Sequence, residues 1–130
     1  MVRLEHSSLN QLVAHANERG TSASRAMVWG HVASLPMWYF VQCGPRDQSV
    51  PWIVFEDDEP MAMVFTDPKL AQRVAQSMIS TDGEIRVVGL PVAAATMYVA
   101  ALEAQGVGKL CINHGPNRFD ASIQETRQGV

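Results

Sequence analysis

The segment PMAMVFTDPKLAQR, residues 60–73, runs from a strand into a helix, and it decides how the chain folds. The apolar run of residues 60–66 predicts a strand, and Pro60 fits its start because a first residue need not donate to the ladder. Asp67 then provides a side-chain N-cap, and Pro68 is the preferred first residue of a helix. We therefore expect a helix with one apolar face, formed by Leu70, Ala71, Val74, Ala75 and Met78.

Strands and helices alternate downstream of this segment. A turn is expected at residues 81–83 and a strand over residues 83–90 (GEIRVVGL). Pro91 opens a helix that Gly106 closes, and residues 109–113 (KLCIN) predict the last strand. An order of strand, helix, strand, helix, strand requires right-handed crossovers, so we expect its three strands to be parallel neighbours in one sheet.

The upstream half predicts two helices and two further strands. Residues 8–34 form a helical hairpin that starts at Ser8 and ends before Pro36. Residues 37–43 (MWYFVQC) are rich in aromatic and β-branched types, which is typical of a strand. Residues 51–56 (PWIVFE) should pair with the strand of residues 60–66 as a hairpin.

The predicted fold class is therefore α/β (α+β). It has an N-terminal helical hairpin, then a mixed sheet of about five strands whose second half is a parallel β-α-β-α-β unit. A length of 130 residues suits one domain. We expect a single domain over residues 1–130, with helices in 8–34, sheet and crossover helices in 37–113, and a short C-terminal segment in 117–130 that becomes a helix.

Composition and charge argue against several kinds of partner. A net charge of −3, with the basic residues dispersed, gives no footprint for nucleic acid. No apolar run approaches the roughly 20 residues that cross a bilayer. The 2 cysteines cannot build a disulfide framework. We expect a cytoplasmic protein that binds neither nucleic acid nor a membrane.

No cofactor or metal is predicted. The chain has no glycine-rich phosphate loop of the GxGxxG or GxxxxGKS/T kind. Pro68 and Pro91 each remove a backbone N–H donor from a helix start that would otherwise attract an anion. The spacings CxxC and HExxH of zinc sites are absent from the sequence, and Cys111 and His114 would project to opposite faces of a strand.

The strand ends supply the first candidate site. Ligands of open α/β sheets bind beyond the carboxyl ends of the parallel strands. The residues expected there form a candidate ligand or partner loop of Thr66, Asp67, Asn113, His114 and Arg118. Because His114 and Arg118 are hydrogen-bond donors, a carboxylate is the ligand that this loop would suit.

A second candidate surface would meet a protein partner. Residues 56–59 (EDDE) are four consecutive acids in a hairpin turn, where they diverge too far to share a cation and keep the turn solvated. Successive side chains of a strand point to opposite faces, so one set of the aromatic side chains in residues 37–43 is expected to form a contact surface. Trp38, Asp57 and Asp58 are therefore the candidate partner surface.

Cys111 and His114 have the residue types of a thiol nucleophile and its base. Cys111 is flanked by Leu110 and Ile112 in an apolar strand, and such surroundings raise the pKa of a thiol and limit its contact with solvent. No catalytic residue is therefore predicted.

Several strings of this sequence resemble the N-terminal domain of the bacterial SseB (enhanced serine sensitivity protein B) family. They are the paired N-terminal helices, the strand of residues 37–43, the segment PMAMVFTDPKLAQR, and the helix and strand of PVAAATMYVAALEAQGVGKLCINHGP. The resemblance covers residues 8–120, although Asn113-His114-Gly115-Pro116 replaces the family's Asn-Pro-Gly turn. It implies an α/β fold, a stand-alone version of that domain, and no established catalytic residues.

Three functional hypotheses follow. The leading one is a non-catalytic protein-interaction or regulatory module that binds a protein partner or a second copy of itself. The second is a small-molecule or peptide carboxylate binder that uses Asp67, Asn113, His114 and Arg118. The third is a thiol or hydrolytic enzyme that uses Cys111 and His114.

Overall fold

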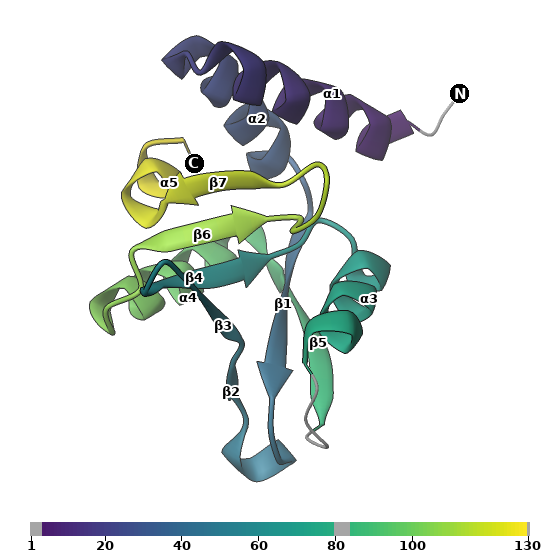
Figure 1. Cartoon of the computed structure of the whole chain (residues 1–130), viewed down its shortest axis with the longest axis vertical. Coiled ribbons are helices and arrows are strands. Elements are labelled where there is room, and N and C mark those ends of the chain that lie inside the picture. The colour runs from purple at the N-terminus through teal and green to yellow at the C-terminus, as the bar shows by residue number, and fades with distance from the viewer. Residues whose placement is uncertain (1–3, 80–83, 130) are drawn as a thin grey trace.

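The computed structural model describes residues 4–79 and 84–129 (Figure 1). Within these residues, helices lie at both ends of the chain and also connect its strands. In chain order the elements are α1 (Leu4–Arg19), α2 (Ser22–Ala33), β1 (Met37–Cys43), a short 3₁₀ turn (Arg46–Gln48), β2 (Val50–Pro51), β3 (Ile53–Glu56), β4 (Glu59–Val64), α3 (Pro68–Met78), β5 (Ile85–Pro91), α4 (Val92–Ala104), β6 (Lys109–Ile112), β7 (Phe119–Ser122) and α5 (Ile123–Gly129).

The strands form two sheets rather than one. The first has the order β2-β1-β5 and is antiparallel, and the second has the order β3-β4-β6-β7, in which only β4 and β6 are parallel. The sheets meet where Tyr39 and Phe65 exchange two backbone hydrogen bonds of 2.8 and 2.9 Å. In Figure 1 the long β1–β5 ladder descends from this crossing point.

The predicted fold class and the N-terminal helical pair are confirmed, whereas the single sheet with three parallel strands is wrong. β5 pairs antiparallel with β1 over seven residues, from Met37 opposite Pro91 to Cys43 opposite Ile85. The β4–β6 ladder is only four residues long, so β5 gains a longer set of hydrogen bonds by joining β1. Most residues of β5 are half-buried, which does not suit the centre of a parallel sheet.

The predicted strand of residues 51–56 is divided between the two sheets. β2 pairs with β1, and β3 pairs with β4 as the expected hairpin. The change of sheet occurs at Trp52, whose backbone N–H still donates to the carbonyl of Val41 at 2.9 Å. Residues 50–56 therefore form an outer strand of both sheets in turn.

The two ends of the chain also differ from expectation. α1 begins at Leu4, before the predicted start at Ser8. The segment expected to be only a C-terminal helix contains strand β7 as well, which pairs antiparallel with β6 before α5 begins. In β7 the buried Phe119 and Ala121 alternate with exposed polar residues. The turn expected at residues 81–83 and the end of the chain at Val130 lie outside the described residues.

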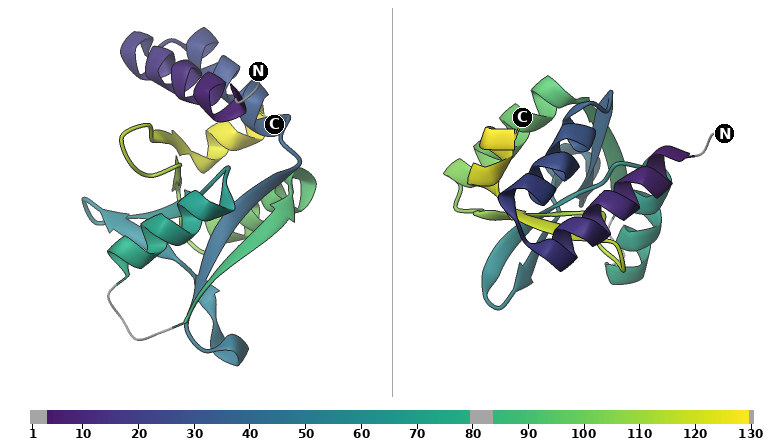
Figure 2. Two further views of the ribbon diagram at one scale, coloured as in Figure 1. Left: turned by 90° about the vertical axis from the view of Figure 1, so that its right-hand side faces the viewer. Right: turned by 90° about the horizontal axis from the view of Figure 1, so that it is seen from above.

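Sheet β3-β4-β6-β7 separates two hydrophobic cores. One face packs against α1, α2, α4 and α5, and Phe119 and Trp38 lie in this core. The other face packs against α3 and the β1–β5 ladder, with Cys111 fully buried among Met61, Met63 and Ala75. Figure 2, with Figure 1, shows α3 and α4 on opposite sides of the molecule and α1 with α2 at one end.

Gly89 provides a test of the β1–β5 contact. A Cβ atom at this position would lie 2.8 Å from Tyr39 Cε1 and 2.9 Å from Met37 Cε. We expect Gly89→Ala to lower the free energy of unfolding by about 1–3 kcal/mol, measured by urea unfolding, because the Tyr39 ring must move. Gly108→Ala is the matched control, since its Cβ meets nothing within 4 Å. Equal stabilities for the two variants would contradict the described packing.

Candidate functional site

Two of the predicted strand-end residues lie together as a structural pair. Asn113 follows β6 and Thr66 follows β4, so the parallel strands bring them to the same edge of the sheet. Asn113 Oδ1 accepts from the Thr66 backbone N–H at 3.0 Å, and Asn113 Nδ2 donates to Thr66 Oγ1 at 2.9 Å. Asn113 is 7% exposed and has a φ of 57°, a backbone conformation that asparagine tolerates better than most residues. Its amide is therefore occupied in fastening the strand ends.

Asp67 lies beside this pair and caps α3. Its Oδ1 accepts from the Lys69 backbone N–H at 3.1 Å, and Pro68 is the first residue of the helix, as the sequence predicts. The carboxylate thereby satisfies a helix N–H and opposes the positive end of the helix dipole. Asp67 would repel an anionic ligand, so it does not assist a carboxylate site.

Arg118 does not face the strand-end pair. Its guanidinium donates to both carboxylate oxygens of Glu56, at 2.9 and 3.1 Å, and its Nε donates to Asp120 Oδ1 at 2.9 Å. It also lies 3.6 Å from the Met61 sulfur, so it reaches across the sheet from the start of β7 to the end of β3. Two carboxylates already neutralise this arginine, which removes it from the predicted carboxylate site.

The electrostatics agree with this placement of Arg118. Its hydrogen bond to Glu56 raises the pKa of the guanidinium and lowers the pKa of the Glu56 carboxyl. His114 is half-buried in the loop after Asn113, and its ring contributes weakly to the lowered pKa of Glu56. The five predicted loop residues are therefore divided. Thr66, Asp67 and Asn113 hold the strand ends and α3 together. Arg118 is paired with Glu56 of β3, and His114 is half-buried in the loop after Asn113 without joining either group.

The structure opposes a catalytic role for Cys111. The side chain is fully buried, and burial raises the pKa of its thiol strongly, so the nucleophilic thiolate is disfavoured. The hydrogen bonds between described residues include none that joins Cys111 to His114. Cys43 is half-buried, and burial raises the pKa of its thiol as well.

Trp38 does not belong to a partner surface. It is 1% exposed, and its indole N–H donates to the Val32 carbonyl at 2.9 Å. Alternation alone could not decide this, because helices cover the face of β1 that carries Trp38 while α3, β4 and β6 cover much of the other. The structure thus corrects this part of the predicted surface.

Asp57 and Asp58 are exposed at the tip of the β3–β4 hairpin. Their φ angles are 52° and 63°, as in a two-residue hairpin turn of type I′. The flanking acids are paired, Glu56 with Arg118 at 2.9 Å and Glu59 with Lys109 at 2.8 Å. Neither Asp57 nor Asp58 forms an ion pair with any residue that the structure describes.

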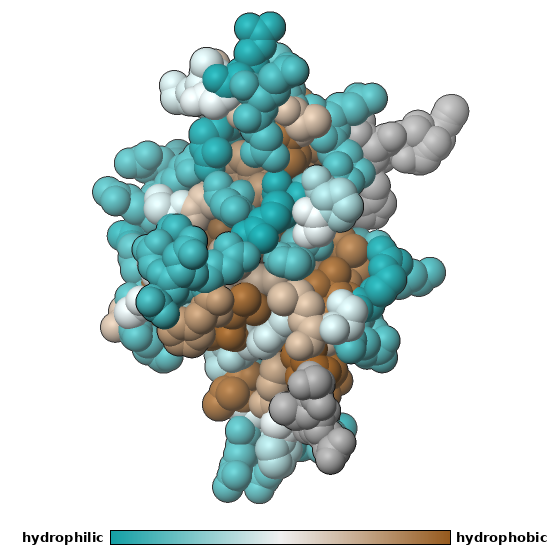
Figure 3. Space-filling model, in the orientation of Figure 1, coloured by the Kyte–Doolittle hydropathy of each residue, from teal (hydrophilic) through white to brown (hydrophobic). Residues whose placement is uncertain are grey.

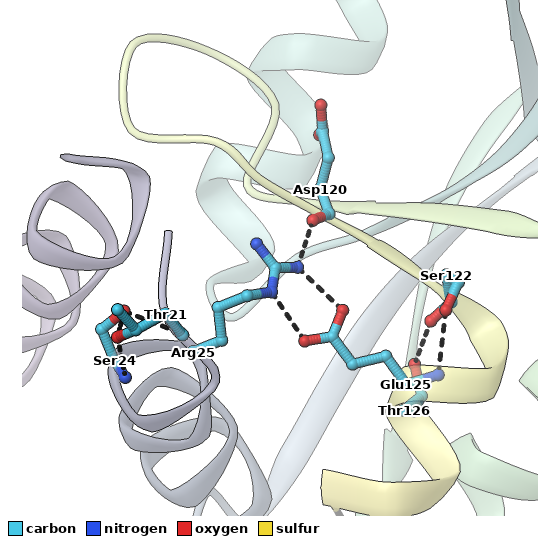
Figure 4. A network of polar contacts seen from close by, with 7 residues as sticks. All are labelled: Thr21, Ser24, Arg25, Asp120, Ser122, Glu125 and Thr126. Atoms are coloured by element: carbon cyan, nitrogen blue, oxygen red, sulfur yellow. Dashed lines mark hydrogen bonds and ion pairs between the residues drawn. The ribbon is translucent and has the colours of Figure 1, made fainter. Parts of the chain in front are cut away.

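A polar network that is not evident from the sequence covers the side of β7 that has no strand partner among the described residues (Figure 4). Arg25 of α2 donates to Glu125 of α5 at 2.7 and 2.8 Å, and to the backbone carbonyl of Asp120 in β7 at 2.7 Å. Its guanidinium also lies 4.3 Å from the centroid of the Phe119 ring. Arg25 and Glu125 are separated by 100 positions, so no spacing rule links them. The alternation Phe119-Asp120-Ala121-Ser122 is the signal that could have located β7.

The opposite edge of the molecule is apolar and open. Phe55 of β3 is 68% exposed and Val50 of β2 is 58% exposed. Trp52, Ile53 and Val54 between them are half-buried. Figure 3 shows hydrophobic residues gathered where β2 and β3 lie in Figure 1. We call residues 50–56 the outer edge.

Comparison with models of known protein families finds no match to this chain, and a search of curated proteins also finds no match. Within residues 4–79 and 84–129, no three His, Cys, Asp or Glu side chains gather closely enough to hold a metal ion. None of the helices in that part of the chain combines the length and apolar character that crossing a bilayer requires.

Asn113 provides a test of the strand-end pair. Asn113→Ala removes both hydrogen bonds to Thr66 and places an alanine at a φ of 57°. We expect a loss of about 2–4 kcal/mol in the free energy of unfolding, measured by denaturant titration. Asn113→Gly removes the same amide without backbone strain, so its loss should be smaller. Two variants as stable as the wild type would show that the pair does not hold the strands.

The Arg25–Glu125 pair predicts an acid-sensitive contribution to stability. The hydrogen bond from Arg25 lowers the pKa of the Glu125 carboxyl below its unfolded value. The stabilisation is therefore complete above the unfolded pKa, near 4.3, and is lost as the pH falls through the lower folded pKa. We expect Glu125→Gln to cost about 1 kcal/mol at neutral pH and less as the solution becomes more acidic.

Thermal unfolding across this pH range measures the effect. Arg25→Gln should follow the same acid profile as Glu125→Gln, because each variant lacks one half of the pair. A difference from the wild type that stays constant down to the lowest pH would contradict the assignment.

Proposed function

We propose that this chain is a non-catalytic protein-interaction module that binds an extended segment of a partner protein along the outer edge, residues 50–56. The observation that carries the proposal is the 68% exposure of Phe55 on a terminal strand of the sheet. A large exposed aromatic side chain on an edge strand is costly for an isolated domain and marks contact sites.

The contrast between the two edges of the four-stranded sheet supports this choice. At β7, Arg25 donates a hydrogen bond to the backbone carbonyl of Asp120, and α5 follows this strand directly. At β3, the only ladder partner among the described residues is β4, so the outward backbone groups are open to another strand. Proteins usually blunt such edges with charge or cover them. The edge at β3 is apolar and open, whereas the opposite edge at β7 is closed, and an open edge of this kind suits strand addition by a partner.

The side chains and charges at the outer edge indicate which kind of partner segment would bind there. Phe55 and Ile53 would meet apolar side chains at alternate positions of an added strand. Asp57 and Asp58, which have no ion pair within the described residues, lie just beyond the end of this edge. A basic residue in the partner segment would meet them without competing for Glu56 or Glu59, which Arg118 and Lys109 already neutralise. The partner is therefore an extended segment with alternating apolar residues and at least one Lys or Arg.

We also propose that the chain is a bacterial, cytoplasmic relative of the SseB N-terminal domain. The order of the elements supports this proposal, since a helical pair precedes the strand Met37–Cys43. The strand-turn-helix through Asp67 and the final helix and strand up to Asn113 support it as well. The proposal requires no catalytic residue.

Selection of displayed random heptapeptides tests the contact. The library is first depleted on Phe55→Lys and then selected on the wild-type chain. We expect the enriched peptides to alternate apolar residues, to contain Lys or Arg, and to bind Phe55→Lys at least about tenfold more weakly. Met97→Lys is the matched control, because Met97 is 73% exposed on α4 and far from the outer edge in sequence. It should bind these peptides as the wild type does, and Asp57→Asn should reduce their dependence on salt.

Two outcomes would overturn the proposal. Enriched peptides that bind Phe55→Lys as tightly as the wild type would place the contact elsewhere. A wild-type mass of two chains by light scattering, reduced to one chain in Phe55→Lys, would show that the occupant of the edge is a second copy.

A further inference from the structure

A small hollow adjoins the strand-end pair without including most of the residues predicted there. It has a volume of about 140 Å³ and is lined by Leu9, His31, Leu35, Pro36, Met37, Tyr39 and Thr66. These residues come from α1, the end of α2, the start of β1 and the turn before α3. Figures 1 and 2 show α1 extending over the end of the molecule at which α3 begins. Of the five predicted loop residues, only Thr66 reaches this hollow.

The polar side chains of the lining are all able to donate hydrogen bonds. Tyr39 and Thr66 carry hydroxyls, and His31 carries a ring N–H. Thr66 Oγ1 accepts from Asn113, so its own proton remains available to a ligand. Asp67 is not among the residues that line the hollow, and none of the described side chains that line it is acidic. Three donors without a competing carboxylate favour an acceptor-rich, anionic ligand.

Contacts outside the hollow fix the Thr66 hydroxyl, the Tyr39 ring and the backbone of His31. Thr66 is fixed by its two bonds with Asn113. Tyr39 is held by the backbone bonds to Phe65, and its ring lies against Gly89, where even a Cβ atom would be too close. His31 lies in the last turn of α2, and its carbonyl accepts from both the backbone and the hydroxyl of Ser34. A binding site with preorganised donors costs less ordering when it is filled.

Size and apolar lining restrict the ligand further. A cavity of this volume is comparable to one that holds a single benzene molecule, or about six non-hydrogen atoms. Leu9, Leu35 and Met37 provide the apolar part of the lining. We infer that this hollow is a binding site for a small carboxylate with a short branched apolar tail, whose oxygens bond to Tyr39, Thr66 and His31. This site is separate from the outer edge and does not depend on the function proposed for that edge.

A nitrogen-15 NMR titration with isobutyrate tests the inference on the intact chain. We expect saturable shifts of the amides around His31, Tyr39 and Thr66, with a Kd on the order of 1 mM. Isobutyramide has the same shape without the charge and should bind about tenfold more weakly. Tyr39→Phe should weaken isobutyrate binding to a similar degree. Tyr98→Phe, which removes a hydroxyl that accepts from Gln42 instead, should leave the binding unchanged.

Three results would overturn the inference. One is equal binding of isobutyrate and isobutyramide, and another is a shift pattern that is non-saturable or centred elsewhere. The third is tighter binding of N-acetylvaline than of isobutyrate, because this larger probe carries its carboxylate on a peptide-like chain. That result would mean that the hollow receives the end of a polypeptide rather than a small acid.

Discussion

The two backbone hydrogen bonds between Tyr39 and Phe65 join the two sheets, and the other features depend on this crossing. They place the start of β1 across the end of β4. The next residue, Thr66, is bonded to Asn113, which fixes the end of β6, and Asp67 then starts α3. The consecutive residues Phe65, Thr66 and Asp67 thereby position both sheets, helix α3 and the hollow beside Tyr39.

The same arrangement determines which edges remain available. With β5 on one side of β1, the chain between β1 and β4 occupies the other side of β1 and then the outer side of β4, through residues 50–56. The helical pair at the N-terminus lies near the other end of the four-stranded sheet, where Arg25 reaches β7 and Glu125. One edge is closed by contacts distant in sequence, and the other keeps apolar side chains in solvent. This asymmetry is the physical basis of the proposal that a partner binds at the outer edge.

Local chemistry made part of this structure predictable. The Asp67 cap, the Pro68 start of α3 and the strand Met37–Cys43 depend on neighbouring residues, and all three agree with the structure. The pairing of strands depends on contacts between distant segments, so the division into two sheets and the partner of β5 could not be read from periodicity. β7 was missed because it has only four residues and begins beside the turn at Gly115-Pro116.

The candidate site divides in the same way. Thr66 and Asn113 meet because parallel strands align their ends, which a sequence pattern can predict. Arg118 bonds to Glu56 and Asp120 instead, since it follows a turn whose direction the sequence does not specify.

Native-state hydrogen exchange tests the crossing between Tyr39 and Phe65 most directly. We predict that the amides of Tyr39 and Phe65 open only with global unfolding, whereas the amides of β3 exchange at least about tenfold faster. Tyr39 and Phe65 amides that exchange as fast as those of β3 would contradict the account.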